Sequence, residues 1–216
     1  MIDGKHKAAA RLVTAVAVAG VGAAGVLSAG AGAADAAKLP GGFKSRSVPG
    51  GKVTIRLFDE SFRITNSVAN NHFSREVFVS GKVKVTTSGD IEGGTVTAGY
   101  LVGCQLNFGA ESEGSAEQPF DSEGTGDAEA GVDAGFTLSP GEAKFVPVVN
   151  VVDDEDEEID AFDFSDARGG VAYSAERFGV DGCAGFAQAR ALVNVQVETD
   201  GKKSNVTLYG RPFSIG

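Results

Sequence analysis

The sequence predicts an all-β protein, a sandwich or a barrel, with one long segment in which acidic and apolar residues alternate as in a strand. Apolar residues alternate with polar ones over short runs, as at 53–57 and 193–197, and an Asp-Gly pair at 200–201 follows the second run. Glycine is frequent, with 31 of 216 residues, as expected for a chain with many turns. Between 107 and 137 acidic and apolar side chains occupy alternate positions, the pattern of a strand with one wet face and one apolar face.

The first 36 residues have the features of a secretory signal peptide. Lys5, Lys7 and Arg11 precede an apolar stretch rich in Ala, Val and Gly. The stretch ends in an A-x-A sequence at residues 34–36, of the kind that signal peptidase cleaves. A membrane anchor is the alternative, but the small residues at the end of the stretch favour cleavage. We therefore expect residues 1–36 to be a signal peptide and the protein to be exported.

The chain without its signal is strongly acidic. Loss of residues 1–36 removes three of the 19 basic side chains and two of the 29 acidic ones, which leaves a formal charge of −11. This charge argues against nucleic acid as a partner, because phosphate contacts require a basic surface. It favours a surface that attracts cations. The remaining length, about 180 residues, is enough for one domain with its own core.

Cys104 and Cys183 are the two cysteines of the chain. In an exported protein an isolated pair most simply forms one disulfide, worth about 4–5 kcal/mol in the chain-entropy model. Metal binding is the alternative, but the mature chain offers only one histidine, His72, as a further ligand of that type. We expect a disulfide, and neither a metal site nor a cofactor.

The strand candidates follow one another at short intervals, as in a sandwich or barrel. An alternating run at 53–57 comes first. Valines at 77 and 79 and at 83 and 85 flank Ser80-Gly81, which predicts a hairpin turning at that pair. A further strand is expected at 95–102. Asp-Gly at 200–201 predicts a tight hairpin near the end of the chain.

In the segment from 107 to 137, acidic side chains occupy odd-numbered positions and apolar side chains occupy even-numbered ones. Its carboxylates all stand at odd positions: Glu111, Glu113, Glu117, Asp121, Glu123, Asp127, Glu129 and Asp133. Its Phe, Val and Ala side chains all stand at even positions. Successive strand residues point to opposite faces, so one face would be carboxylate and the other apolar. A transmembrane β-barrel offers water to the first face and lipid to the second.

Residues 153–160 form a second acidic stretch, interrupted only by Ile159. One interpretation is a solvated loop that repels itself. The other is a site that gathers cations, such as Ca²⁺, at a pore mouth. The spacing does not match an EF-hand loop, because no Gly stands at the turn.

No set of residues typical of catalysis emerges from the sequence. There is no Walker loop, no dinucleotide fingerprint, no paired-histidine zinc motif and no G-x-S-x-G elbow. His72 follows two asparagines and is expected to be an exposed loop residue. We therefore do not expect an enzyme.

Four patterns occur in order along the mature chain. They are FSREVFVSG at 73–81 with GYLVGC at 99–104, LSPGE at 138–142 with GGVA at 169–172, VDGCAG at 180–185, and residues 187–197 with TLYGRP at 207–212. Together they resemble the MspA-type porins of the mycolic-acid outer membrane. The pair of cysteines resembles one branch of that family.

The resemblance implies a goblet-shaped homo-octamer in the outer membrane. Each subunit contributes a β-sandwich rim domain, here residues 37–106 and 139–216, and one hairpin, here residues 107–138. The hairpins of the octamer close a sixteen-stranded barrel. Its constriction corresponds here to Asp121, Glu123 and Asp127 near the hairpin tip. The other acids of the hairpin, Glu111, Glu113, Glu117, Glu129 and Asp133, are expected to line the pore.

The residues suggest a register for this hairpin. If Ala116 faces Val132, carboxylates confront each other only where Asp121 faces Asp127, which limits repulsion between like charges. The function expected is a passive, water-filled channel for small hydrophilic solutes that prefers cations. Its partners would be other copies, outer-membrane lipid, and small cations and hydrophilic solutes.

The alternative is a secreted, disulfide-pinned sandwich that binds cations, glycans or a surface partner. Residues 107–138 would then be a solvated acidic loop. Two features favour this alternative. The apolar face is mostly Ala, which gains little from lipid, and Pro119 removes a backbone hydrogen-bond donor.

Overall fold

The computed structural model describes residues 36–66, 74–108, 136–148, 151–152 and 158–216. Nowhere in these ranges is there a helix, and hence none that is long and apolar enough to cross a membrane. The all-β prediction is therefore confirmed for the described part of the chain. The strands are β1 (Ala37–Lys38), β2 (Gly42–Val48), β3 (Gly51–Asn66), β4 (Arg75–Gly89), β5 (Gly94–Cys104), β6 (Phe136–Thr137), β7 (Ala143–Pro147), β8 (Val151–Val152), β9 (Glu158–Ile159), β10 (Ala161–Phe164), β11 (Arg168–Asp181), β12 (Ala187–Thr199), β13 (Lys202–Tyr209) and β14 (Phe213–Ser214).

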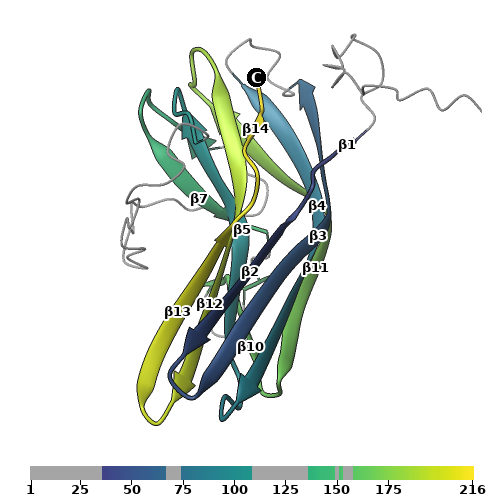
Figure 1. Ribbon diagram of the computed structural model, residues 1–216. Coiled ribbons are helices and arrows are strands. Elements are labelled where there is room, and N and C mark those ends of the chain that lie inside the picture. The colour runs from purple at the N-terminus through teal and green to yellow at the C-terminus, as the bar shows by residue number, and fades with distance from the viewer. Residues whose placement is uncertain (1–35, 67–73, 109–135, 149–150, 153–157) are drawn as a thin grey trace, which may run out of the picture. The chain divides into compact units, whose positions relative to one another are not determined.

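The first sheet is built on three long antiparallel strands, β3, β4 and β11 (Figure 1). β2 pairs with the first half of β3, and β1 pairs with the same side of β3 farther along. At the opposite side of the sheet, β6 pairs in parallel with the end of β11. β2 and β11 therefore lie on opposite sides of this sheet.

The second sheet has the order β10, β5, β12 and β13. β7 pairs with the last residues of β5, and β14 with the first residues of β12. β12 and β13 pair from Leu192 with Tyr209 to Thr199 with Lys202, so only Asp200 and Gly201 make the turn. Both residues have positive φ, 51° and 70°, as a tight hairpin turn requires. The predicted Asp-Gly hairpin is confirmed.

The inner faces of the two sheets pack into one hydrophobic core, and alternate residues of each strand supply it. On β3, Val53, Ile55 and Leu57 are at most 2% exposed, as their alternation with polar residues predicts. On β12, Val193, Val195 and Val197 contribute to the core in the same way. Two sheets joined by a single core make the described part of the chain a β-sandwich.

The predicted hairpin at Ser80-Gly81 is wrong. The chain runs through this pair without turning and forms the single strand β4. Instead, the neighbouring strands β3 and β11 both bulge at the same level. A Cβ added at Gly81 would lie only 2.5 Å from the hydroxyl oxygen of Tyr173. Glycine here therefore marks a close approach of a ring to the backbone, and not a turn.

The bulge in β3 turns a carboxyl group into the core. Glu60 is only 1% exposed, and its Oε1 accepts a hydrogen bond of 3.1 Å from the hydroxyl of Tyr100. That hydroxyl lies 3.0 Å from the hydroxyl of Tyr173, whereas Glu60 Oε2 has no hydrogen-bond partner among the described residues. Burial raises the pKa of Glu60 to about 7, although the hydrogen bond from Tyr100 lowers it.

Candidate functional site

The candidate site, which we call the root, is the part of the sandwich where the described chain stops at Phe108 and resumes at Phe136. The outgoing chain continues from β5, in the second sheet, through Gln105 to Phe108. The returning chain enters the first sheet, because Phe136 and Thr137 pair with Val180 and Asp181 at the end of β11. The two ends of the segment are thus attached to different sheets.

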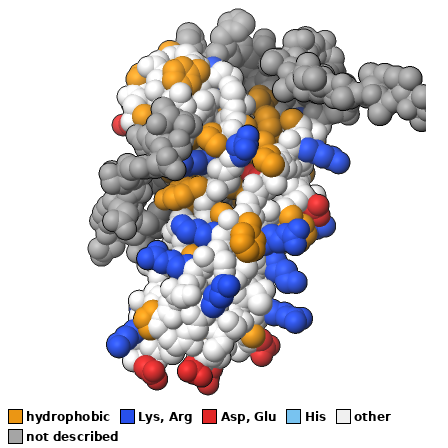
Figure 2. All heavy atoms as spheres, viewed as in Figure 1, with side chains coloured by type: hydrophobic (Ala, Val, Ile, Leu, Met, Phe, Trp, Pro, Cys, Tyr) orange, Lys and Arg blue, Asp and Glu red, His pale blue; other side chains and the backbone are white. Residues whose placement is uncertain are grey.

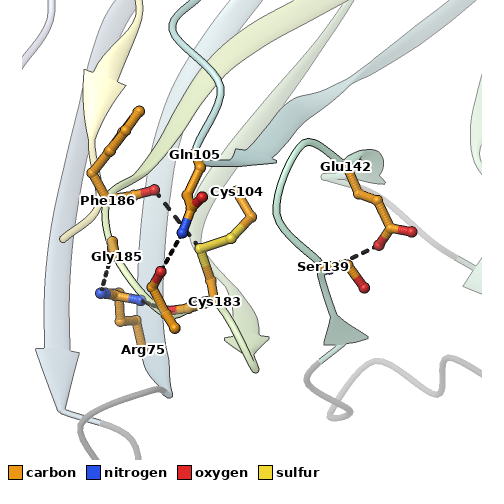
Figure 3. Close-up of a disulfide and its surroundings, with 9 residues drawn as sticks. Arg75, Cys104, Gln105, Ser139, Glu142, Cys183, Gly185 and Phe186 are labelled. Carbon is orange, nitrogen blue, oxygen red and sulfur yellow. Dashed lines mark hydrogen bonds between the residues drawn. A yellow bond between two sulfur atoms is a disulfide. The ribbon is translucent and has the colours of Figure 1, made fainter.

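A disulfide joins the two sheets at the root (Figure 3). Cys104 is the last residue of β5, and Cys183 lies just after the end of β11. Their sulfur atoms are 2.11 Å apart, their Cα atoms 5.6 Å apart, and both side chains are fully buried. The predicted disulfide is confirmed. The two cysteines are 79 positions apart in sequence. For a loop of this length the chain-entropy model gives about 4–5 kcal/mol of stabilisation.

Polar side chains hold the loop that carries Cys183. The guanidinium of Arg75 donates to the carbonyl oxygens of Cys183, at 3.1 Å, and Gly185, at 2.8 Å. The amide of Gln105 donates to the carbonyl of Ala184, and its backbone N–H donates to the carbonyl of Phe186. These bonds satisfy successive carbonyls of an irregular loop, so the disulfide sits in a fixed frame.

The returning chain is bonded to the same strand end. The backbone N–H of Cys104 donates to the carbonyl of Glu142, and the N–H of Gly141 donates to the carbonyl of Cys104. Gly141 and Glu142 belong to a turn that begins at Ser139. The Glu142 carboxylate closes this turn, because it accepts a hydrogen bond from the backbone N–H of Ser139 at 2.8 Å. Outgoing and returning chain are therefore held together by backbone bonds as well as by the disulfide.

Aromatic rings stand at both ends of the segment. The Phe108 ring packs on the backbone of Gly103, where a Cβ would lie 2.8 Å from it, and its N–H donates to the side chain of Gln188. The Arg190 guanidinium contacts the rings of both Phe108 and Tyr209, at 4.8 and 4.3 Å from their centroids. At the other end, Lys144 Nζ lies 5.1 Å from the Phe136 ring centroid. Such cation–π contacts fix the rings at the points of exit and entry.

Most of the predicted site residues lie outside the described residues. These are the expected constriction, Asp121, Glu123 and Asp127, and the expected pore lining, Glu111, Glu113, Glu117, Glu129 and Asp133. Residues 1–35 and 153–157 lie outside them too. The described residues contain no group of three or more His, Cys, Asp or Glu side chains that could hold a metal ion.

Sequence reasoning missed the residues that build the root. Arg75 is one of several arginines on alternating strands, and nothing near it in sequence signals a bond to a loop 108 positions away. Arg190 likewise stands on an ordinary strand, and its sequence neighbours do not signal its contacts with the rings of Phe108 and Tyr209. The signal for the disulfide was the isolated cysteine pair itself.

Comparison with known proteins agrees with this architecture. The sequence model of the MspA family matches residues 49–214, which is most of the chain. The match begins just before β3 and ends with β14, so it includes every strand except β1 and β2 and both sides of the root. No curated protein sequence gives a match. The extent of the family match shows that the chain belongs to the MspA family of porins.

Proposed function

We propose that the protein is a passive, water-filled outer-membrane channel for small hydrophilic solutes that prefers cations. Family membership supports the porin function. The observation that carries the finer proposal is the parity of residues 107–137, where every carboxylate stands at an odd position and every Phe, Val and Ala at an even one. A ribbon with this pattern suits a barrel wall between a wet lumen and lipid.

The root supports a hairpin made by residues 107–138. Because the outgoing and returning ends are bonded to each other beside Cys104, the segment between them can run out and back as two adjacent strands. From Phe108 to Phe120 a strand would be roughly 40 Å long, and a tilt of about 40° gives close to 30 Å of height. This is enough to cross the apolar part of a bilayer.

A single hairpin cannot close a barrel, so the proposal requires self-association. In the octamer that the resemblance implies, copies of Asp121, Glu123 and Asp127 would bring about 24 carboxylates close to one ring. Rings of Asp and Glu favour cations over anions. Export through a signal peptide at 1–36, and an outer-membrane location, complete the proposal.

Single-channel recording in planar bilayers under a KCl gradient tests it. We expect stepwise conductance and a reversal potential of the sign that cation preference gives. The double variant Asp121→Asn, Asp127→Asn should weaken this preference more than Asp153→Asn, Asp154→Asn, which removes the same charge from the other acidic stretch. Acidification to pH 4 should also weaken it, because carboxylates with an ordinary pKa of about 4 then gain protons.

Two results would contradict the proposal. A cation preference that is unchanged at pH 4 would rule out the carboxylate ring. Mature protein that stays soluble without detergent and never conducts would favour the secreted binding module instead.

A further inference from the structure

The acidic charge of the mature chain is concentrated in two stretches. Thirteen of its acids lie in 109–135 and 153–157, whereas all basic residues after position 36 lie in the described ranges. The described sandwich therefore carries nearly balanced charge. Within it, the two open sides of the sandwich differ in sign.

One side, which we call the basic edge, is formed by β2 of the first sheet and β13 of the second. β2 pairs only with β3, and β13 only with β12, so each strand ends its sheet here. Lys44 bridges the two strands, because its Nζ donates to the carbonyl of Thr207 at 2.6 Å. Arg46 on β2, and Lys202 and Lys203 at the start of β13, are exposed. Figure 2 views this side and shows Lys and Arg side chains spread over it, with Asp and Glu gathered mainly at one end.

The basic edge also exposes a large apolar side chain. Phe43 of β2 is 68% exposed, the largest value among the exposed large hydrophobic residues in the described part of the chain. No acid in those ranges forms an ion pair with Arg46, Lys202 or Lys203. The nearest acids in the pairing are Glu198, opposite Lys203, and Asp200 in the turn.

The opposite side, which we call the acidic edge, is formed by β10 beside β11. β10 ends the second sheet, and the Phe164 ring packs under Gly169 of β11. Asp160, Asp163 and Asp166 are exposed here. Ile159 is 40% exposed, so this edge also presents an apolar side chain. Arg168 is the one base within two residues of these aspartates.

The two edges lie at the same level of the sandwich and on opposite sides of it. β2 pairs with Gly51–Leu57 of β3, and β10 pairs with Gly94–Thr97 of β5, in both cases in the half that is remote from the disulfide. A surface of one sign on one side and of the other sign on the opposite side cannot match itself. It can match a second copy placed head to tail.

We propose that the basic edge of one copy docks on the acidic edge of the next. Phe43 and Ile159 supply the apolar anchors, and the charged residues around them select the partner and its orientation. Lysine and arginine on an edge strand also oppose direct backbone pairing, so the contact is made by side chains. The inference rests on the proposed self-association and names the surfaces that make it.

Charge reversal tests the contact. The edge variant Arg46→Glu, Lys202→Glu, Lys203→Glu should raise the subunit dissociation constant of the detergent-purified protein at least tenfold, measured by mass photometry on dilution. The control Arg63→Glu, Lys82→Glu, Lys84→Glu makes the same change in net charge at exposed positions of the first sheet that do not pair with β2, and it should assemble like the wild type. Adding Asp160→Lys, Asp163→Lys and Asp166→Lys to the edge variant should recover assembly.

Crosslinking tests the orientation even if a charge variant fails to fold. A bismaleimide should join Phe43→Cys protein to Ile159→Cys protein in a mixture, and should join neither variant to itself. Three outcomes would each overturn the inference. The edge variant could assemble like the wild type, the edge variant and the control could lose assembly equally, or Phe43→Cys protein could crosslink to itself. These readouts are oligomer masses and crosslinks, so an assembly that never conducts would refute the channel and leave the contact standing.

Discussion

The buried carboxyl group of Glu60 makes the stability of the sandwich depend on pH, and Glu60→Gln should remove that dependence. Burial raises the pKa of Glu60 from 4.5 to about 7. At 1.36 kcal/mol per pKa unit, the difference amounts to about 3 kcal/mol between the protonated and ionised forms. Burial is the cause that raises the pKa, the hydrogen bond from Tyr100 opposes it in part, and no cation among the described residues contributes to the shift.

The sign of the effect follows from the raised pKa. The folded state holds the proton more tightly than the unfolded state, so this stabilisation is fully present below pH 4.5. It is lost as the pH rises to about 7, and above that the contribution is constant. Relative to wild type, Glu60→Gln should therefore gain about 3 kcal/mol between pH 4.5 and pH 7.5. For a domain of this size the gain corresponds to a rise of roughly 6–12 °C in Tm.

Urea unfolding of the mature protein at pH 4.5, 6.0 and 7.5 measures this difference. Tyrosine fluorescence is a direct probe, because the chain has no Trp and two of its three Tyr, Tyr100 and Tyr173, belong to the buried cluster. Glu92→Gln, a substitution at an exposed position, is the matched control and should keep the wild-type pH dependence. If Glu60→Gln and wild type show parallel pH profiles, the carboxyl is not desolvated and the reasoning fails.

Two further predictions concern the root and the segment that it carries. Cys104→Ala with Cys183→Ala should lower the free energy of unfolding by about 4–5 kcal/mol in denaturant titrations, and a loss below about 1 kcal/mol would show that hydrogen bonds alone hold the root. Ala116→Cys with Val132→Cys should form a disulfide on mild oxidation, seen as a shift on a non-reducing gel. The offset pair Ala116→Cys with Ala130→Cys should not form one, and the reverse outcome would reject the register.

The sequence predicted those parts of the fold that depend on local pattern. The alternation at 53–57 identifies a strand with one buried face. Asp200-Gly201 identifies a turn, because both residue types tolerate the positive φ that the turn requires. Gly81 was misjudged because the same residue type serves a turn and a close ring contact, and only the partner strand distinguishes the two. Glu60 could not be placed inside, because a bulge changes the side to which all later residues of a strand point.

At the candidate site, too, the sequence predicted only the features that depend on composition or local pattern. The disulfide followed from composition, and the acidic segment was found through its own periodicity. The contacts of Arg75, Gln105 and Arg190 join positions 79 or more residues apart or depend on rings brought together by folding. Pairings of that kind leave no mark in a single sequence.

The bridge between the two sheets has a consequence for the order of events during biogenesis. Because the covalent link and its surrounding carbonyl bonds lie wholly within one copy, the sandwich can reach its final form as soon as the chain meets an oxidising compartment. Copies of the chain would then associate only after each sandwich has been closed by its disulfide.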